Sequence, residues 1–136
     1  MIAYVDSSVL LRKVLRQSGS LREWKAIRTG VASALVETEC LRTLDRLRLR
    51  SNLSDRDLSL RRAAVFRLLE SMEVTAPVLA RAAQPLPTEL GTLDAVHLAT
   101  ALLWSQRIGA GVVMATHDVA LGIAARACGL RVVGDR

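Results

Sequence analysis

Short apolar runs alternate with segments of helical periodicity along the whole chain. Most of the runs are apolar at successive positions and end at polar or turn residues, as buried strands do. They lie at 2–5, 30–33, 73–76, 111–116 and 130–133. Apolar residues at helical spacing cover roughly 8–17, 20–28, 34–50, 55–71, 92–106 and 118–128, and a short helix ends near Gln84. Because continuously apolar strands that alternate with helices are typical of parallel sheets, we predict an α/β fold with a short central parallel sheet flanked by helices on both faces.

The pattern also predicts how several elements end and how the chain is organised. The helix over 92–106 is apolar almost all round, so it is expected to be buried. Residues 51–54 are expected to form a turn, Ser54 to cap the helix that follows, and Gly129 to end the last helix. No repeat, low-complexity tract or linker interrupts this order of elements. The sequence therefore predicts one domain over residues 1–136, a length that suits a single hydrophobic core.

The composition is that of a globular protein with a basic surface. With 51% hydrophobic and 24% charged residues, the chain is excluded from the disordered class. Its formal net charge of +6 makes a polyanion such as nucleic acid a natural partner, although charge alone does not require one. Cys40 and Cys128 show no metal-binding or disulfide spacing, and the N-terminal run lacks the basic segment of a signal peptide. We therefore expect a soluble cytoplasmic protein whose thiols are reduced and buried.

Four acidic residues stand at places where a ligand site is expected. Asp6 follows the first strand, Asp118 follows the fourth, Asp94 lies in the first turn of the apolar helix, and Glu39 lies one turn into the helix after the second strand. In a parallel α/β sheet these positions tend toward the carboxyl edge, where such folds bind their ligands. Carboxylates held close together repel one another, and the hard ions Mg²⁺ and Mn²⁺, which prefer oxygen ligands, relieve that repulsion. A bound ion of this kind supports phosphodiester hydrolysis by activating water and neutralising the phosphate.

Each of these acids also has a purely structural interpretation. An Asp at a helix start is a favoured capping residue, so each of the three aspartates could serve that purpose alone. Glu39 could pair with Arg42 on the helix surface. Glu37 competes with Glu39 for the inward face, because the two side chains point about 200° apart.

Neighbouring polar residues have two interpretations as well. Ser7 or Ser8 could position a metal or a water, although a helix cap is the favoured interpretation of Ser8. His97 could act as a general base, but a hydrogen-bonded core histidine is favoured because the residue lies in a helix that is expected to be buried. The arginines near 42–50 and 56–67 could hold RNA phosphates or could form a solvated surface.

Four segments of the chain resemble PIN-domain nucleases, and within them the VapC-type toxins of VapBC toxin–antitoxin systems. They are Tyr4-Val5-Asp6-Ser7-Ser8, Ser33-Ala34-Leu35-Val36-Glu37-Thr38-Glu39-Cys40-Leu41-Arg42, Leu93-Asp94-Ala95-Val96-His97-Leu98-Ala99-Thr100-Ala101 and Ala115-Thr116-His117-Asp118. Their order and spacing, together with the chain length, agree with the family, so the resemblance covers essentially the whole chain. His117 departs from the residue that the family often has before its last Asp, and this departure leaves the four acids unaffected.

The resemblance implies a PIN-like fold and a Mg²⁺- or Mn²⁺-dependent endoribonuclease, in which a metal-activated water hydrolyses RNA and leaves 5′-phosphate and 3′-hydroxyl ends. The catalytic acids that it implies are Asp6, Glu39, Asp94 and Asp118, and the implied metal ligands are Asp6, Asp94 and Asp118. Glu39 is chosen over Glu37 because the family's Glu stands six residues after the Ser of the second strand, as Glu39 does here. The implied partners are an RNA substrate, a cognate VapB-type antitoxin whose C-terminal segment enters the active-site groove, and a second copy of the chain.

Two other functions compete with this interpretation. A non-catalytic PIN-fold module that binds RNA or a partner protein would be favoured by the loss of one acid, but all four acids are present. A phosphatase of the haloacid-dehalogenase type would use Asp6 as its nucleophile. It would need a second Asp two residues later, where this chain has Ser8.

Overall fold

A parallel sheet forms the centre of the protein. The computed structural model describes residues 1–51, 53–109 and 111–135. Within these residues, five strands pair in the order β3-β2-β1-β4-β5, and every pair is parallel. The strands are β1 (Ile2–Val5), β2 (Thr29–Ser33), β3 (Glu73–Thr75), β4 (Val113–Ala115) and β5 (Arg131–Val133).

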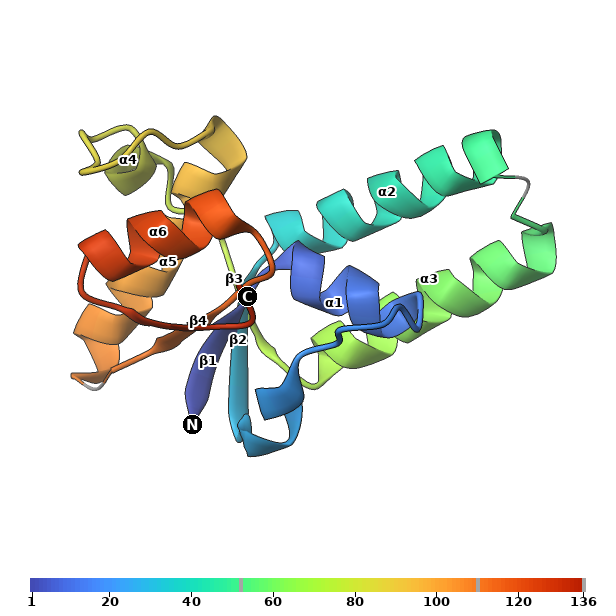
Figure 1. Cartoon of the computed structure of the whole chain (residues 1–136), viewed down its shortest axis with the longest axis horizontal. Coiled ribbons are helices and arrows are strands. Elements are labelled where there is room, and N and C mark those ends of the chain that lie inside the picture. Colours follow the sequence, from blue (N-terminus) through green and yellow to red (C-terminus); the bar gives the residue numbers. More distant parts are fainter. Residues whose placement is uncertain (52, 110, 136) are drawn as a thin grey trace.

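Helices cover both faces of this sheet (Figure 1). They are α1 (Ser7–Val14), the 3₁₀ helix η1 (Arg22–Ala26), α2 (Leu35–Ser51), α3 (Asp55–Glu70), α4 (Leu79–Ala82), α5 (Thr92–Ile108) and α6 (Val119–Ala127). In Figure 1, α1, α2 and α3 lie on one side of the strands, whereas α5 and α6 lie on the other. The predicted fold class, a short parallel sheet flanked by helices on both faces, is confirmed.

The first strand shows why its sequence is apolar at every position. Ala3 and Val5 point into the core formed with α1, α2 and α3, whereas Tyr4 points into the core formed with α5 and α6. All three side chains are fully buried. A strand that is covered on both faces has no solvent-facing position, so alternation is lost.

Some local predictions were wrong in extent or type. The helix expected over 8–17 ends at Val14, and Arg16 has a positive φ of 53°, a conformation that cannot continue an α-helix. The segment over 20–28 contains a 3₁₀ helix instead of an α-helix. The apolar helix α5 is buried only over 95–101, and Leu93 is 50% exposed. An apolar sequence does not require burial, because much of any protein surface is apolar.

The predicted ends of two helices were confirmed, and the predicted burial of the two cysteines was confirmed for one of them. Ser54 caps α3 by accepting a hydrogen bond from the Asp57 amide at 3.1 Å, and Gly129 follows α6 with a φ of 86°. Cys40 is buried as expected, but Cys128 is only half-buried at the end of α6; both thiols are free. Asn52, in the expected turn, lies outside the described residues. No helix in the described part of the chain is long and apolar enough to span a membrane.

The order of the strands reverses beside β1. The chain passes from β1 to β2 on one side and returns to β4 on the other, so the carboxyl ends of β1 and β4 flank a reversal in strand order. The amide of Asp6 continues the pairing by donating to the Ala115 carbonyl at 3.0 Å. Ligands of open α/β sheets bind at such a reversal, and Asp6 and Asp118 stand on either side of it.

Candidate active site

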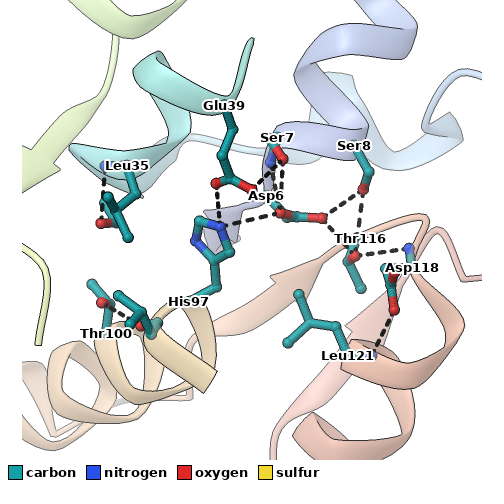
Figure 2. A network of polar contacts seen from close by, with 12 residues as sticks. Asp6, Ser7, Ser8, Leu35, Glu39, His97, Thr100, Thr116, Asp118 and Leu121 are labelled. Atoms are coloured by element: carbon teal, nitrogen blue, oxygen red, sulfur yellow. Dashed lines mark hydrogen bonds and ion pairs between the residues drawn. The ribbon is translucent and has the colours of Figure 1, made fainter. Parts of the chain in front are cut away.

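Asp6 is the most constrained acid of the predicted cluster. It caps α1 and is only 3% exposed. Its carboxylate accepts hydrogen bonds from the Ser7 amide at 2.7 Å, the Ser8 hydroxyl at 2.6 Å and the Thr116 hydroxyl at 2.9 Å (Figure 2). The capping interpretation is therefore correct for Asp6, and the residue also lies at the carboxyl edge of the sheet, beside the reversal in strand order. The interpretation of Ser8 as the cap was wrong, because Ser8 instead donates to Asp6.

Asp118 caps α6, which follows the neighbouring strand β4. Its carboxylate accepts from the Leu121 amide at 2.8 Å, in the first turn of α6. Its own amide donates to the Thr116 hydroxyl at 2.9 Å, and that hydroxyl donates to Asp6. Figure 2 shows Thr116 between the two acids. One threonine thus fixes the spacing between the end of β1 and the start of α6.

Glu39, and not Glu37, faces the cluster. Glu39 lies one turn into α2, and its carboxylate is 2.5 Å from His97 Nε2 and 3.4 Å from the Ser7 hydroxyl (Figure 2). Glu37 lies on the exposed side of the same helix. The surface pair with Arg42 does not form, because Arg42 donates to Asp45 instead.

Asp94 completes the group from the first turn of α5, where Gly91 is the capping position. It is half-buried, and its pKa is raised to about 6, first by burial and then by the negative charges of Asp118 and Asp6. Glu39 adds a smaller effect in the same direction. Asp94 therefore lies within the electrostatic field of all three other acids, as predicted for a cluster of carboxylates.

His97 joins this cluster to the protein core. It is fully buried, as expected for a core histidine, and contacts the Tyr4 hydroxyl through Nδ1 at 2.6 Å. The backbone amide of Ser33 donates to the same hydroxyl at 3.2 Å. Burial lowers the pKa of His97, but the hydrogen bond to Glu39 and the charges of Asp6, Glu39 and Asp94 raise it more, so the net shift is upward.

Sequence reasoning missed two contributors to the site. It assigned neither Tyr4 nor Thr116 a part in the site. A general signal existed for Tyr4, since a tyrosine hydroxyl in a buried strand needs a hydrogen-bond partner. The identity of the partner could not be read, because His97 is 93 residues away along the chain.

The donor set suits a hard divalent cation, although its geometry is not preformed. Four carboxylates converge from the end of β1, from α2 and α5 and from the start of α6. Burial raises the pKa of Asp94 most, and the charges of the other three acids raise it further. Oxygen-only ligands of this charge favour Mg²⁺ or Mn²⁺. However, among the described residues, no group of three or more His, Cys, Asp and Glu side chains is arranged so that it could hold a metal ion. The side chains of Asp6 and Glu39 are instead engaged in hydrogen bonds with Ser8 and His97.

The segment after β5 holds the loop that carries Asp118. The amide of Thr116 donates to the Val133 carbonyl at 3.0 Å, and His117 Nδ1 lies 2.6 Å from the Gly134 carbonyl. Asp135 forms an ion pair with Arg126 of α6. These contacts fix both ends of the loop between β4 and α6.

We expect Gly134→Ala to destabilise the protein by about 2–3 kcal/mol. Gly134 has a φ of +97°, and an added Cβ would lie 2.7 Å from the Thr116 carbonyl oxygen and 2.9 Å from Leu21. Urea denaturation measures the loss. Gly111→Ala is the matched control, because nothing lies within 4 Å of its added Cβ. Equal stability of the two variants would contradict the role of this segment.

Basic side chains gather in a groove between α1 and α3, away from the acids. The groove has a volume of about 510 Å³, and its cationic lining consists of Lys13, Arg16, Arg61 and Arg67. On α2, Arg42 and Arg48 instead pair with Asp45. The arginines of α2 are thus partly neutralised by Asp45, whereas the groove between α1 and α3 is lined by four cationic side chains and by Asp57.

Comparisons with known proteins agree with this geometry. A family model described as the PIN domain matches residues 3–121. The chain is 35% identical over 136 residues to Ribonuclease VapC46 of Mycobacterium tuberculosis, with 96% of this chain and 95% of that protein covered. The crystal structure of FitAcB from Neisseria gonorrhoeae matches with a TM-score of 0.66 at 18% identity and covers 97% of this chain and 96% of that chain. PAE2754 from Pyrobaculum aerophilum matches with a TM-score of 0.63 at 18% identity and covers 96% and 89%. At these identities the two crystal structures support the arrangement of elements alone.

Proposed function

This chain belongs to the PIN-domain family, and from that premise we propose that it is a Mg²⁺- or Mn²⁺-dependent endoribonuclease of the VapC toxin type. The observation that carries the proposal is the convergence of Asp6, Glu39, Asp94 and Asp118 at the strand-order reversal, with the pKa of Asp94 raised to about 6. The likeness to a protein named as a VapC ribonuclease supports RNA as the substrate class.

Each part of the cluster has a role in this proposal. Asp6, Asp94 and Asp118 would hold the cation, and Glu39 would complete the site. A bound cation would neutralise charge on the scissile phosphate and lower the pKa of a coordinated water. Asp6 is already fixed by three strong hydrogen bonds, so it would act as the rigid ligand. Asp94 and Asp118 are only half-buried, which leaves their carboxylates accessible to solvent and to a cation.

The partners follow from the same family membership. We propose that a cognate VapB-type antitoxin inhibits the protein and that the chain forms a homodimer. RNA would be held mainly through its phosphates, since the composition includes only 3% aromatic residues for base stacking. The basic groove between α1 and α3 is the proposed path for that backbone.

The purified, antitoxin-free protein should cut a total-RNA pool with Mg²⁺ or Mn²⁺ and should stop when EDTA is added. The products should carry 5′-phosphates, which a 5′-phosphate-dependent exonuclease would reveal. Glu39→Gln should slow the cleavage at least about tenfold. Glu37→Gln is the matched control on the same helix, because its side chain is exposed, and it should cut at the rate of the unchanged chain.

A folded protein that leaves the pool intact would require a second measurement. Calorimetric titration with Mn²⁺ then separates two cases. Binding that is lost in Asp94→Asn but kept in Glu37→Gln indicates a metal site whose RNA target is absent from the pool. No binding at all would contradict the proposed nuclease and favour a PIN-fold module that binds RNA or a partner without cutting it.

A further inference from the structure

A continuous network of hydrogen bonds connects the sheet to the acidic cluster. The Ser33 amide donates to the Tyr4 hydroxyl, Tyr4 contacts His97 Nδ1 at 2.6 Å, and His97 Nε2 contacts Glu39 at 2.5 Å. Tyr4 and His97 are both fully buried. This network links β2, β1 and α2 to α5, which is far from them in sequence.

The donor and the acceptor at the two ends of this hydrogen-bonded network determine the direction of its outer hydrogen bonds. The Ser33 amide can only donate, and the ionised Glu39 carboxylate can only accept. His97 Nε2 therefore donates to Glu39, and Nδ1 faces the Tyr4 hydroxyl.

Three of the four linked elements also carry or adjoin an acid of the site. Asp6 directly follows β1, two residues after Tyr4. Asp94 precedes His97 by three residues on α5, and Glu39 of α2 is itself the end of the network. His97 Nε2 lies 3.8 Å from the nearer oxygen of Asp6 as well. A movement of His97 would therefore change the separations among three of the four acids.

We propose that Tyr4 and His97 are positioning residues, which fix the Glu39 carboxylate toward the acidic cluster and set the spacing of the three linked acids. This inference rests on the proposed nuclease function. Neither side chain needs to touch RNA. Their effect is exerted through Glu39, whose carboxylate would otherwise rotate on a flexible side chain, since it is 22% exposed and its second oxygen has only the long 3.4 Å contact with Ser7.

Two substitutions of His97 separate positioning from simple filling of the core. His97→Gln can place an amide nitrogen near the position of Nε2 and so keep the donor to Glu39. His97→Asn is too short to do so and can replace only Nδ1. Tyr4→Phe keeps the ring but removes the hydroxyl that orients His97. A role in packing alone would affect the two His97 variants alike.

The experiment measures cleavage kinetics with Mn²⁺, Mn²⁺ affinity and thermal stability for all three variants. His97→Asn should lower kcat about 10- to 100-fold and weaken Mn²⁺ binding by a similar factor, with little change in the KM for RNA. His97→Gln should recover most of both losses, and Tyr4→Phe should fall between the two. Equal effects of Gln and Asn, or losses that follow the fall in melting temperature, would overturn the proposal.

An NMR measurement keeps this proposal separate from the proposed function. In ¹⁵N-labelled protein without metal, His97 should show a slowly exchanging proton on Nε2, and Glu39→Gln should shift that resonance, whereas Glu37→Gln should not. If the unchanged chain binds no Mn²⁺ and cuts no RNA, the nuclease proposal fails, and this signal alone decides whether Tyr4 and His97 position Glu39. The absence of the signal would overturn the positioning role even if cleavage is observed.

Discussion

The Asp94→Asn variant should be more stable than the unchanged chain near neutral pH in EDTA, by about 1 kcal/mol, although it should cut RNA at least about a hundredfold more slowly. The pKa of Asp94 is raised to about 6, first by burial and then by Asp118 and Asp6. Its negative charge therefore opposes folding, and a neutral amide of the same shape removes that opposition. The full shift would correspond to about 3 kcal/mol, but Asp94 is half-buried, so solvent screening reduces the figure.

The pH dependence gives this prediction a definite sign. The unfolded carboxyl has a pKa of about 3.9, whereas that of folded Asp94 is about 6. Below both values the proton is bound in both states, and Asp94 does not disfavour folding. As the pH rises through this interval, the unfolded state releases its proton first, so stability falls until the pH passes the folded pKa.

Thermal melts in EDTA across this interval check the effect. The advantage of Asp94→Asn should be present near neutral pH and should vanish below about pH 3, where Asp94 is protonated in both the folded and the unfolded state. Adding Mn²⁺ should stabilise the unchanged chain more than the variant, because ligand binding to the folded state raises stability. A variant that is less stable than the unchanged chain near neutral pH without metal would show that Asp94 is stabilised by its surroundings, contrary to the electrostatic account.

The positions of the four acids could be read from the sequence because the signals are local. Asp6 and Asp118 each follow a short apolar run directly, and a parallel sheet brings the ends of such runs to one edge. The choice between Glu37 and Glu39 needed the family spacing, since helical periodicity only shows that the two face apart. The structure then placed Glu39 against His97 and left Glu37 exposed.

The contacts that organise these acids could not be read in the same way. Thr116 bridges Asp6 and Asp118 only because β4 pairs with β1, and Tyr4 reaches His97 only because α5 packs on one face of the sheet. Both depend on side-chain directions across elements that are about a hundred residues apart, for which periodicity contains no information. The 3₁₀ helix η1 was missed because a short apolar pattern does not distinguish the two kinds of helix.

The two aspartates at the centre of the site differ in what surrounds them, and their substitutions should differ accordingly. Asp94 meets mostly negative charge, whereas Asp6 is surrounded by donors: the Ser7 amide and the hydroxyls of Ser8 and Thr116. The same loss of one negative charge should therefore stabilise the protein at one position and destabilise it at the other.

Asp6→Ala should lower the free energy of unfolding by about 2–4 kcal/mol, because it leaves buried donors without an acceptor and removes the cap of α1. Asp6→Asn keeps the shape and one acceptor oxygen, so about half of that loss is expected. Urea denaturation of both variants in EDTA measures the difference, with Glu37→Gln as an exposed acid that should leave stability unchanged. An Asp6→Ala protein as stable as the unchanged chain would mean that the donors find water instead. If the expected loss occurs, missing cleavage in Asp6→Ala cannot by itself assign a ligand, and Asp94→Asn, which should remain folded, is the variant on which the metal site should be judged.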